Sequence, residues 1–240
     1  MRATASAALA LLCVLVISGC RSAHDPLPGF PRLMLWAWER PEDLRFLDPR
    51  NAGVAYLAET VFLRRTGAEM RPRLQPLRIA PGTKLMAVVR IESAGGPTPD
   101  VNRAADLVAG AATQPDVSAL QLDYDAVRGE RPFYRRLAAA VRARMPSRMP
   151  LTMTALVSWC ISDPWIRGLP VSEATPMYFR MGPEPRLRTL PLRNQMCLGS
   201  IGLSTDELVR VPVHGRVFVF NPRPWTREAL YAAVAEVNRW

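Results

Sequence analysis

Eight short apolar runs, separated by polar and helical segments, are the feature that most constrains the fold of this 240-residue chain. Each run has the length of a β-strand, and several are rich in Val, Met and aromatic residues, which favour strands. The runs are residues 33–38, 54–61, 85–92, 117–125, 151–159, 174–181, 200–203 and 216–221. Alternation of strands and helices predicts an α/β fold with a parallel sheet. Because there are eight runs, we expect the sheet to close as a (β/α)8 TIM-type barrel formed by residues 33–240.

Three segments between or after the runs carry apolar residues at steps of three and four, which predicts helices. They are residues 99–113, 131–145 and 224–240. The expected barrel is small and partly irregular. A short helix is expected over 41–47, and residues 62–79 favour an extended loop or hairpin in place of the second helix. An open doubly wound sheet is the alternative fold.

Acidic residues stand at the ends of three neighbouring runs. In a barrel, alternate strand residues point inward, and chemistry takes place at the C-terminal strand ends. In the fourth run Leu120, Leu122 and Tyr124 share the apolar face, whereas Gln121, Asp123 and Asp125 share the other. The apolar face should meet helices, so the aspartates are expected to point into the mouth of the barrel.

The two preceding runs contribute further charges to this mouth. Alternation in residues 85–92 places Arg90 and Glu92 inward, and Glu59 lies near the end of residues 54–61. Several charges at one strand end are costly unless they are paired or solvated, which is typical of functional clefts.

The segment 122–125, Leu-Asp-Tyr-Asp, resembles chitinase-type glycoside hydrolases, whose fourth strand carries Asp-x-Asp-x-Glu. In that family the aspartates orient and tune the glutamate that protonates the glycosidic oxygen. This chain has Val127 at the position of the glutamate. The family's sixth strand carries Met-x-Tyr-Asp, where this chain has Phe179 and Arg180 in place of Tyr and Asp.

Longer segments resemble a bacterial domain family of unknown function with hydrolase-like barrels. They are residues 120–125, 152–160, 176–182 and 202–207. This resemblance supports the barrel and implies no particular reaction.

A glycoside hydrolase is the first functional hypothesis, because two carboxyl groups flanking a sugar bond suffice for its cleavage. We interpret Asp123 or Asp125 as one partner and Glu92 or Glu59 as the other. Arg90 would keep one acid ionised while its neighbour keeps its proton. The residues expected to contact the glycan are Gln121, Arg90, Trp36, Trp38, Trp159, Tyr178, Arg180 and Trp225.

Two alternatives stay open beside hydrolysis. One is an envelope scaffold that binds a glycan or protein without cleaving it, which the loss of the glutamate at position 127 favours. The other, ranked third, is a divalent-cation site built from Glu59, Glu92, Asp123 and Asp125. No cofactor and no histidine-based metal site are expected.

The N-terminus combines a basic start at Arg2, an apolar run over 7–17 and small residues before Cys20, which is typical of a secretory signal. Residues 17–20, Ile-Ser-Gly-Cys, resemble the lipobox of bacterial lipoproteins. The resemblance implies cleavage after residue 19, lipidation of Cys20 and a tether over 20–32. Arg21 in the next position favours the outer membrane of a two-membrane bacterium.

The remaining cysteines and the charge balance bear on the redox compartment of the protein and on the kind of partner it binds. Cys160 and Cys197 would enter an oxidising compartment, and their spacing leaves open whether they form a disulfide. The net charge is +10, but Lys84 is the only lysine. The almost exclusive use of arginine over lysine indicates the codon bias of a GC-rich genome more than it indicates an acidic partner. No basic stripe interleaved with aromatic residues predicts nucleic-acid binding.

Overall fold

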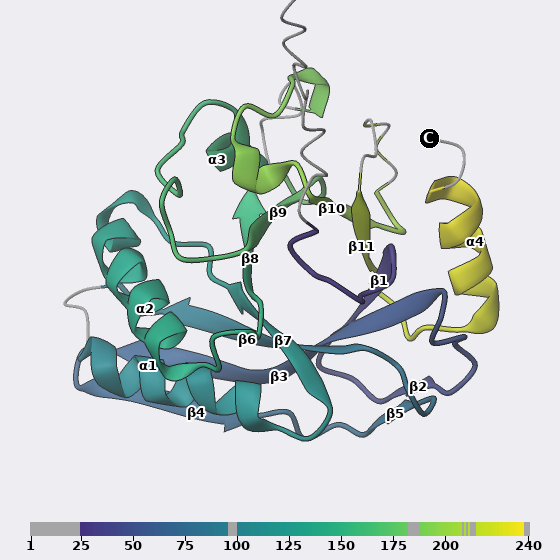
Figure 1. Ribbon diagram of the computed structural model, residues 1–240, viewed down its shortest axis with the longest axis horizontal. Coiled ribbons are helices and arrows are strands. Elements are labelled where there is room, and N and C mark those ends of the chain that lie inside the picture. The colour runs from purple at the N-terminus through teal and green to yellow at the C-terminus, as the bar shows by residue number, and fades with distance from the viewer. Residues whose placement is uncertain are drawn as a thin grey trace, which may run out of the picture.

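The computed structural model describes residues 25–95, 100–181, 188–207, 209, 211 and 215–237 (Figure 1). The expected signal segment, Cys20 and the first tether residues lie outside this part of the chain. The barrel strands are β1 (Leu33–Ala37), β3 (Ala52–Arg64), β6 (Leu85–Ser93), β7 (Val117–Asp123), β8 (Leu151–Leu156), β9 (Glu173–Met177), β10 (Ser200–Ser204) and β11 (Arg216–Phe220). Three further strands are β2 (Glu42–Leu44), β4 (Gly67–Pro72) and β5 (Leu77–Ile79). The helices are α1 (Val101–Gly110), η1 (Ala111–Thr113), η2 (Arg128–Glu130), α2 (Arg131–Arg144), α3 (Val157–Ile161), η4 (Gln195–Cys197) and α4 (Arg227–Val237).

Eight parallel strands form a closed barrel. Their order is β1-β11-β10-β9-β8-β7-β6-β3, and β1 also pairs in parallel with β3. Each of the eight predicted runs contributes one of these strands. The open doubly wound sheet is therefore wrong, because β1 has a partner on both edges. The α/β class and the closed barrel are confirmed, with helices that are few and irregular for a TIM-like barrel.

The long strand β3 has two different partners, β1 and β4, along its length, within one sheet. Residues 52–56 pair with β1, whereas residues 59–64 pair antiparallel with β4. The second helix is thus replaced by a hairpin, as the pattern of residues 62–79 predicts. Between Leu57 and Glu59 the register with β6 shifts by one residue. This β-bulge changes the face to which the rest of β3 points.

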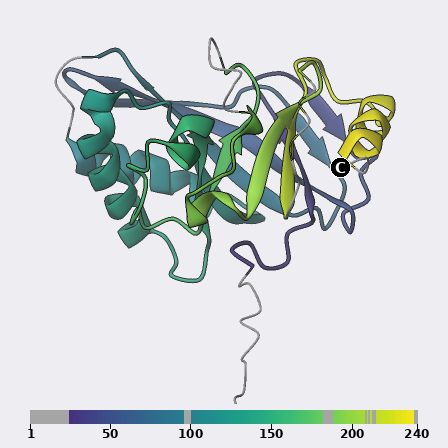
Figure 2. The same ribbon diagram turned by 90° about the horizontal axis from the view of Figure 1, so that it is seen from above.

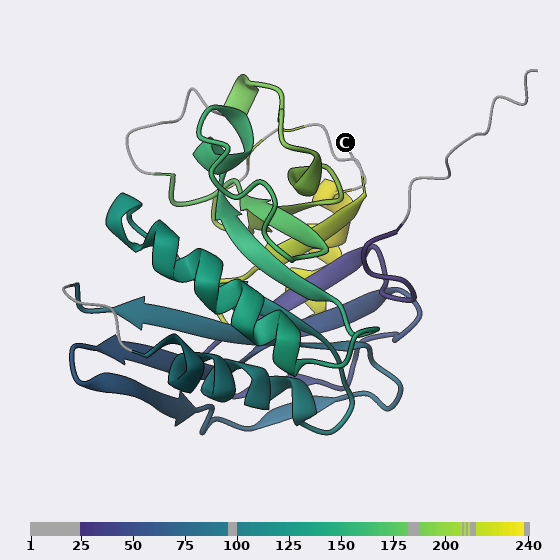
Figure 3. The same cartoon turned by 60° about the vertical axis from the view of Figure 1, so that its left-hand side comes forward.

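Helices cover the barrel unevenly. Helices α1 and α2 lie side by side over one part of the sheet, and α4 lies on the other side of the molecule (Figures 1 and 3). Asp100 caps α1 by accepting a hydrogen bond from the backbone of Asn102, 2.9 Å away. The helices expected over 99–113, 131–145 and 224–240 correspond to α1 with η1, α2 and α4.

Two local expectations are wrong. Residues 41–47 do not form a helix, because residues 42–44 form β2, which pairs with β5. The buried Glu42 carboxylate holds this segment by accepting from the backbone of Trp225 (2.9 Å) and from Arg40 Nε (2.7 Å). In addition, Val157 begins α3 instead of extending β8, so the predicted strand over 151–159 ends at Leu156.

Apolar side chains fill the barrel and the space between its strands and the helices. The inner cluster includes Met34, Trp36, Met86, Val88 and Phe218, and the larger outer cluster lies beneath the helices. Figure 2 shows the barrel strands from above, with α4 beside them.

Residues of the expected tether close the floor of the barrel, which is the end at which the strands begin. Leu27 and Phe30 are buried in the inner cluster. Arg216 holds this segment, since its guanidinium donates to the carbonyls of Leu27 and Pro31 and to the carboxylate of Asp25. Residues 25–32 are thus part of the barrel body, which differs from a free tether.

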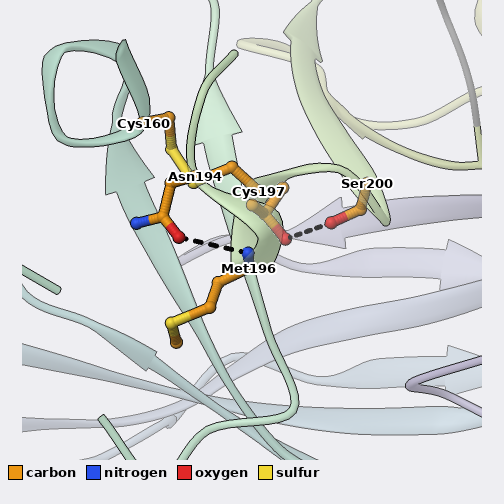
Figure 4. Close-up of a disulfide and its surroundings, with 6 residues drawn as sticks. Cys160, Asn194, Met196, Cys197 and Ser200 are labelled. Carbon is orange, nitrogen blue, oxygen red and sulfur yellow. Dashed lines mark hydrogen bonds between the residues drawn. A yellow bond between two sulfur atoms is a disulfide. The ribbon is translucent and has the colours of Figure 1, made fainter. Parts of the chain in front are cut away.

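A disulfide joins Cys160 in α3 to Cys197 in η4, with 5.9 Å between the two Cα atoms. Figure 4 shows the bond beside Asn194, whose side-chain oxygen accepts a hydrogen bond from the backbone of Met196 (3.2 Å). The carbonyl of Cys160 accepts bonds from the backbones of Arg193 (2.8 Å) and Asn194 (3.1 Å). The bond therefore ties the connection before β10 to the end of β8.

We expect Gly215→Ala to destabilise the protein much more than Gly82→Ala. Both glycines have positive φ, at 94° and 80°. A Cβ on Gly215 would lie 2.3 Å from the carbonyl oxygen of Gly199, whereas a Cβ on Gly82 meets nothing within 4 Å. Chemical denaturation should give a loss of about 1 kcal/mol for Gly82→Ala, the cost of the strained backbone. Gly215→Ala should lose clearly more, and equal losses would contradict the close packing at the floor.

Candidate functional site

A cavity of about 560 Å³ opens at the C-terminal ends of the barrel strands. Its lining comes from β1, β6, β7, β8, β9, β11 and the residues that follow them. The lining residues are Trp36, Trp38, Arg90, Asp123, Asp125, Thr154, Leu156, Val157, Ser158, Met177, Phe179, Arg180, Met181 and Phe220. One wall is aromatic and another is acidic.

Asp123 is the most deeply buried charged group of this cavity, with 6% of its surface exposed. Its Oδ1 accepts a hydrogen bond from Thr154 Oγ1 at 2.8 Å, and its Oδ2 accepts one from Arg90 Nη1 at 3.3 Å. Burial and the nearby charge of Asp125 raise the pKa of Asp123 to about 6, against the opposing effects of Thr154 and Arg90. The carboxyl group therefore exchanges its proton within a pH unit or so of neutrality.

Arg90 connects two neighbouring cavities. Its Nε donates to Glu92 Oε1 at 2.9 Å while Nη1 donates to Asp123. The second cavity, of about 460 Å³, shares Arg90, Asp123 and Asp125 with the first and adds Glu92 and Glu130. Asp125 lies at the solvent edge. Its partial burial in the walls raises its pKa, and Arg90 acts in the opposite direction.

Glu59 does not line either cavity, although its place near a strand end suggested the mouth. It is in register with Val89, which belongs to the outer cluster. Paired residues of parallel strands point to the same face, so Glu59 faces the helices. The bulge after Leu57 causes this change of face. Burial raises the pKa of Glu59 to about 7.

The aromatic wall is built by side chains from three strands. Trp36 and Trp38 of the first expected run line the cavity, together with Phe179 and Phe220. The Phe179 and Phe220 rings stack with centroids 5.9 Å apart and an angle of 9° between their planes. The Trp36 ring packs on Phe218, with 5.2 Å between centroids. This wall offers flat apolar surfaces next to the acids.

Four other residues expected to contact a ligand lie elsewhere. Gln121 is fully buried beneath the cavity, where its Oε1 accepts a hydrogen bond from Trp36 Nε1 at 2.9 Å. Trp159, Tyr178 and Trp225 are buried in the outer cluster. Single tryptophans and tyrosines often fill cores, and nothing in the residue type distinguishes the two roles.

Sequence reasoning missed several lining residues. Phe179 and Phe220 stand two positions beyond the inward-facing Met177 and Phe218, so strand alternation could have found them. Alternation along β8 could have found Thr154 in the same way. Leu156 continues this alternation two positions beyond Thr154, whereas Val157 and Ser158 could not be found in this way, because they begin α3.

Within the described ranges, no group of three or more His, Cys, Asp or Glu side chains is arranged to hold a metal ion. The arrangement expected from Glu59, Glu92, Asp123 and Asp125 is not formed, since Glu59 faces the helices. Among the described helices, none has the length and apolar character to span a membrane.

No known family model, curated protein or solved structure matches this chain.

We expect the protein to lose stability as the pH rises from about 4 to about 7. Glu59 and Glu173 have pKa values raised to about 7, and Asp123 to about 6, in each case mainly by burial. The folded state then binds protons that the unfolded state has released, so the free energy of unfolding falls with pH in this window. For Glu173 the rise from 4.5 to about 7 corresponds to roughly 3 kcal/mol.

Urea denaturation at pH 5 and pH 8 checks this expectation. Glu173→Gln should reduce the difference between the two pH values, because the amide has no proton to lose. Glu69→Gln on the exposed side of β4 is the matched control and should leave the difference unchanged. A protein that is equally stable or more stable at pH 8 would show that these acids are not held in their neutral form.

Proposed function

We propose that this chain is an envelope lipoprotein whose (β/α)8 TIM-type barrel binds a carbohydrate at its mouth and hydrolyses a glycosidic bond there. The observation that carries the proposal is the placement of Asp123. A carboxyl group with a pKa of about 6 lies next to a second carboxyl group, Asp125, in a cavity with an aromatic wall. Cleavage of a glycosidic bond requires two carboxyl groups with different pKa values, one protonated and one ionised.

The two aspartates differ in the roles they can take. Asp123, when protonated, donates its proton to the glycosidic oxygen as the bond between that oxygen and the anomeric carbon breaks. Asp125, at the solvent edge, accepts a proton from the water that adds to the anomeric carbon. Thr154 and Arg90 orient the Asp123 carboxyl group and limit the rise of its pKa. Glu92, bonded to Arg90 in the neighbouring cavity, acts on the pair through that arginine.

The aromatic wall supports a sugar as the ligand. Pyranose rings present flat faces of C–H groups, which pack on aromatic rings, while their hydroxyl groups bond to polar side chains. Trp36 and Trp38 lie on one side of the cavity and the polar groups Thr154 and Ser158 lie on another. The volume of about 560 Å³ falls in the range of small-ligand sites.

A binding scaffold without catalysis is the second candidate function. One observation favours it: both oxygens of Asp123 already accept hydrogen bonds, from Thr154 and Arg90. The position where chitinase-type hydrolases carry the proton-donating glutamate is occupied by Val127, which is 64% exposed. On this alternative, the same cavity would hold a glycan and release it intact.

We expect Asp123→Asn to abolish cleavage while glycan binding persists. Loss of a general acid costs about 10²- to 10⁴-fold in rate. Asp116→Asn is the matched control, since Asp116 is exposed at the opposite end of the same strand. Its left-handed backbone, with φ at 62°, is readily adopted by asparagine. Product release from a panel of envelope and plant oligosaccharides, followed by mass spectrometry, measures the effect.

The outcomes separate the two candidate functions. Cleavage by the wild type and by Asp116→Asn, but not by Asp123→Asn, supports the hydrolase. Binding without cleavage by all three proteins supports the scaffold. If the wild type neither binds nor cleaves any member of the panel, the carbohydrate proposal is wrong.

The proposed membrane anchor depends on Cys20. The lipobox-like residues 17–20 and Arg21 support an exported lipoprotein sorted to the outer membrane. Two or more acyl chains on one residue bind a bilayer far more firmly than one chain. We expect the full chain to label with a radioactive fatty acid in a two-membrane bacterium and to fractionate with outer membranes. Cys20→Ser should remove the label, whereas Cys13→Ser should retain it, and labelled Cys20→Ser would exclude this anchor.

A further inference from the structure

Arg180 lines the mouth cavity without an acidic partner among the described residues. It follows β9, is exposed to solvent, and forms none of the ion pairs found in the described part of the chain. Arg90, the other arginine of the cavity, is paired with Glu92 and Asp123. Among the described residues that line this cavity, Arg180 is therefore the cationic group that can pair with a ligand.

The backbone of Arg180 is held in a conformation that side chains other than glycine rarely adopt. Its φ is 51°, in the left-handed region. Its N–H donates to Glu207 Oε2 at 2.7 Å, and Glu207 in turn pairs with Arg188. Such backbone strain persists where surrounding contacts impose it. Here those contacts come from the segment after β10, and they fix the direction in which Arg180 leaves the strand.

Aromatic rings orient the guanidinium of Arg180. Its Cζ lies 5.3 Å from the centroid of the Phe220 ring, which stacks on Phe179. A guanidinium on an aromatic face keeps its N–H groups directed outward along its edge, where they match the two oxygens of a carboxylate. The stacked arginine thus presents donors to the cavity without the entropy of a freely rotating side chain.

The acids lie two strands away from Arg180 around the mouth. Asp123 ends β7, and β8 separates β7 from β9, which precedes Arg180. With neighbouring strands about 4.8 Å apart, β7 and β9 are about 10 Å apart, close to the length of a disaccharide. An anionic group on the ligand would be repelled by Asp125 and attracted by Arg180. The charges of the cavity therefore favour one orientation of an acidic ligand.

We infer that the mouth selects a carbohydrate that carries a carboxylate, with this group on Arg180 and the neighbouring sugar linkage at Asp123. The inference rests on the proposed function, because it names the substrate class of the same cavity. Neutral glycans would contact the aromatic wall and the polar side chains but would form no ion pair with Arg180, so they would bind more weakly. The ligand class is thus an acidic oligosaccharide, such as one built from uronic acids.

Paired oligosaccharides test the inference directly. The probes are tetrasaccharides of galacturonate, guluronate and hyaluronan, each compared with its carboxyl-reduced counterpart, and binding is followed through tryptophan fluorescence. We expect at least one acidic probe to bind the wild type about tenfold or more tightly than its reduced form. Arg180→Gln should remove this preference, because the affinity for the acidic probe should fall about tenfold or more relative to the affinity for the reduced form.

Two further variants keep the result interpretable. Arg180→Asn also removes the charge and readily adopts the left-handed backbone, so it should behave like Arg180→Gln even if the latter folds poorly. Arg148→Gln, an exposed arginine before β8 at the opposite end of the barrel, is the matched control for loss of one positive charge. It should keep the preference for the acidic probe.

Failure of this inference is distinguishable from failure of the proposed function. If acidic and reduced probes bind equally, or if Arg180→Asn keeps the preference, the selection by Arg180 is wrong while the carbohydrate site stands. If no probe of either kind binds the wild type, and no member of the wider glycan panel binds, both are wrong. If only neutral members of that panel bind, the inference alone is overturned.

Discussion

Strand β1 forms hydrogen bonds along both of its edges, with β3 on one side and β11 on the other, and this closure determines the rest of the molecule. A closed parallel barrel gathers all eight C-terminal strand ends into one ring. Side chains from distant parts of the chain, such as Trp36, Asp123 and Phe220, therefore meet around one cavity. Closure also leaves no free edge in the ring, so the strands can be short and the helices few.

The chemistry of the mouth follows from a balance at Asp123. Burial and the neighbouring Asp125 favour the neutral carboxyl group, whereas Thr154 and Arg90 favour the carboxylate. Neither set of contacts dominates fully, so the pKa of Asp123 lies near 6 instead of near either extreme. The interactions of Arg90 with Glu92 and Asp123 extend this balance to the neighbouring cavity.

The barrel could be predicted from the sequence because the apolar run typical of a strand occurs eight times. Each run predicts one strand independently of the others. The sequence also predicted the inward direction of Asp123, since the register of β7 with β6 is continuous from Ala119 to Asp123. Glu59 was misplaced because one extra residue in a bulge reverses a strand's faces, and no residue type marks that bulge. The strand β2 was missed for a different reason. Residues 42–44 are held by contacts with Trp225 and β5, which are distant in sequence and absent from any local pattern.

Arg216 binds Asp25 and the carbonyls of residues 27, 30 and 31 at the floor of the barrel, opposite the mouth. This contact fixes the point from which the preceding chain departs. Any attachment upstream of Asp25 would accordingly pull on the closed end of the barrel. The open end would then face away from the surface that holds the protein, where a long polymer can reach it from the side without threading past a bilayer.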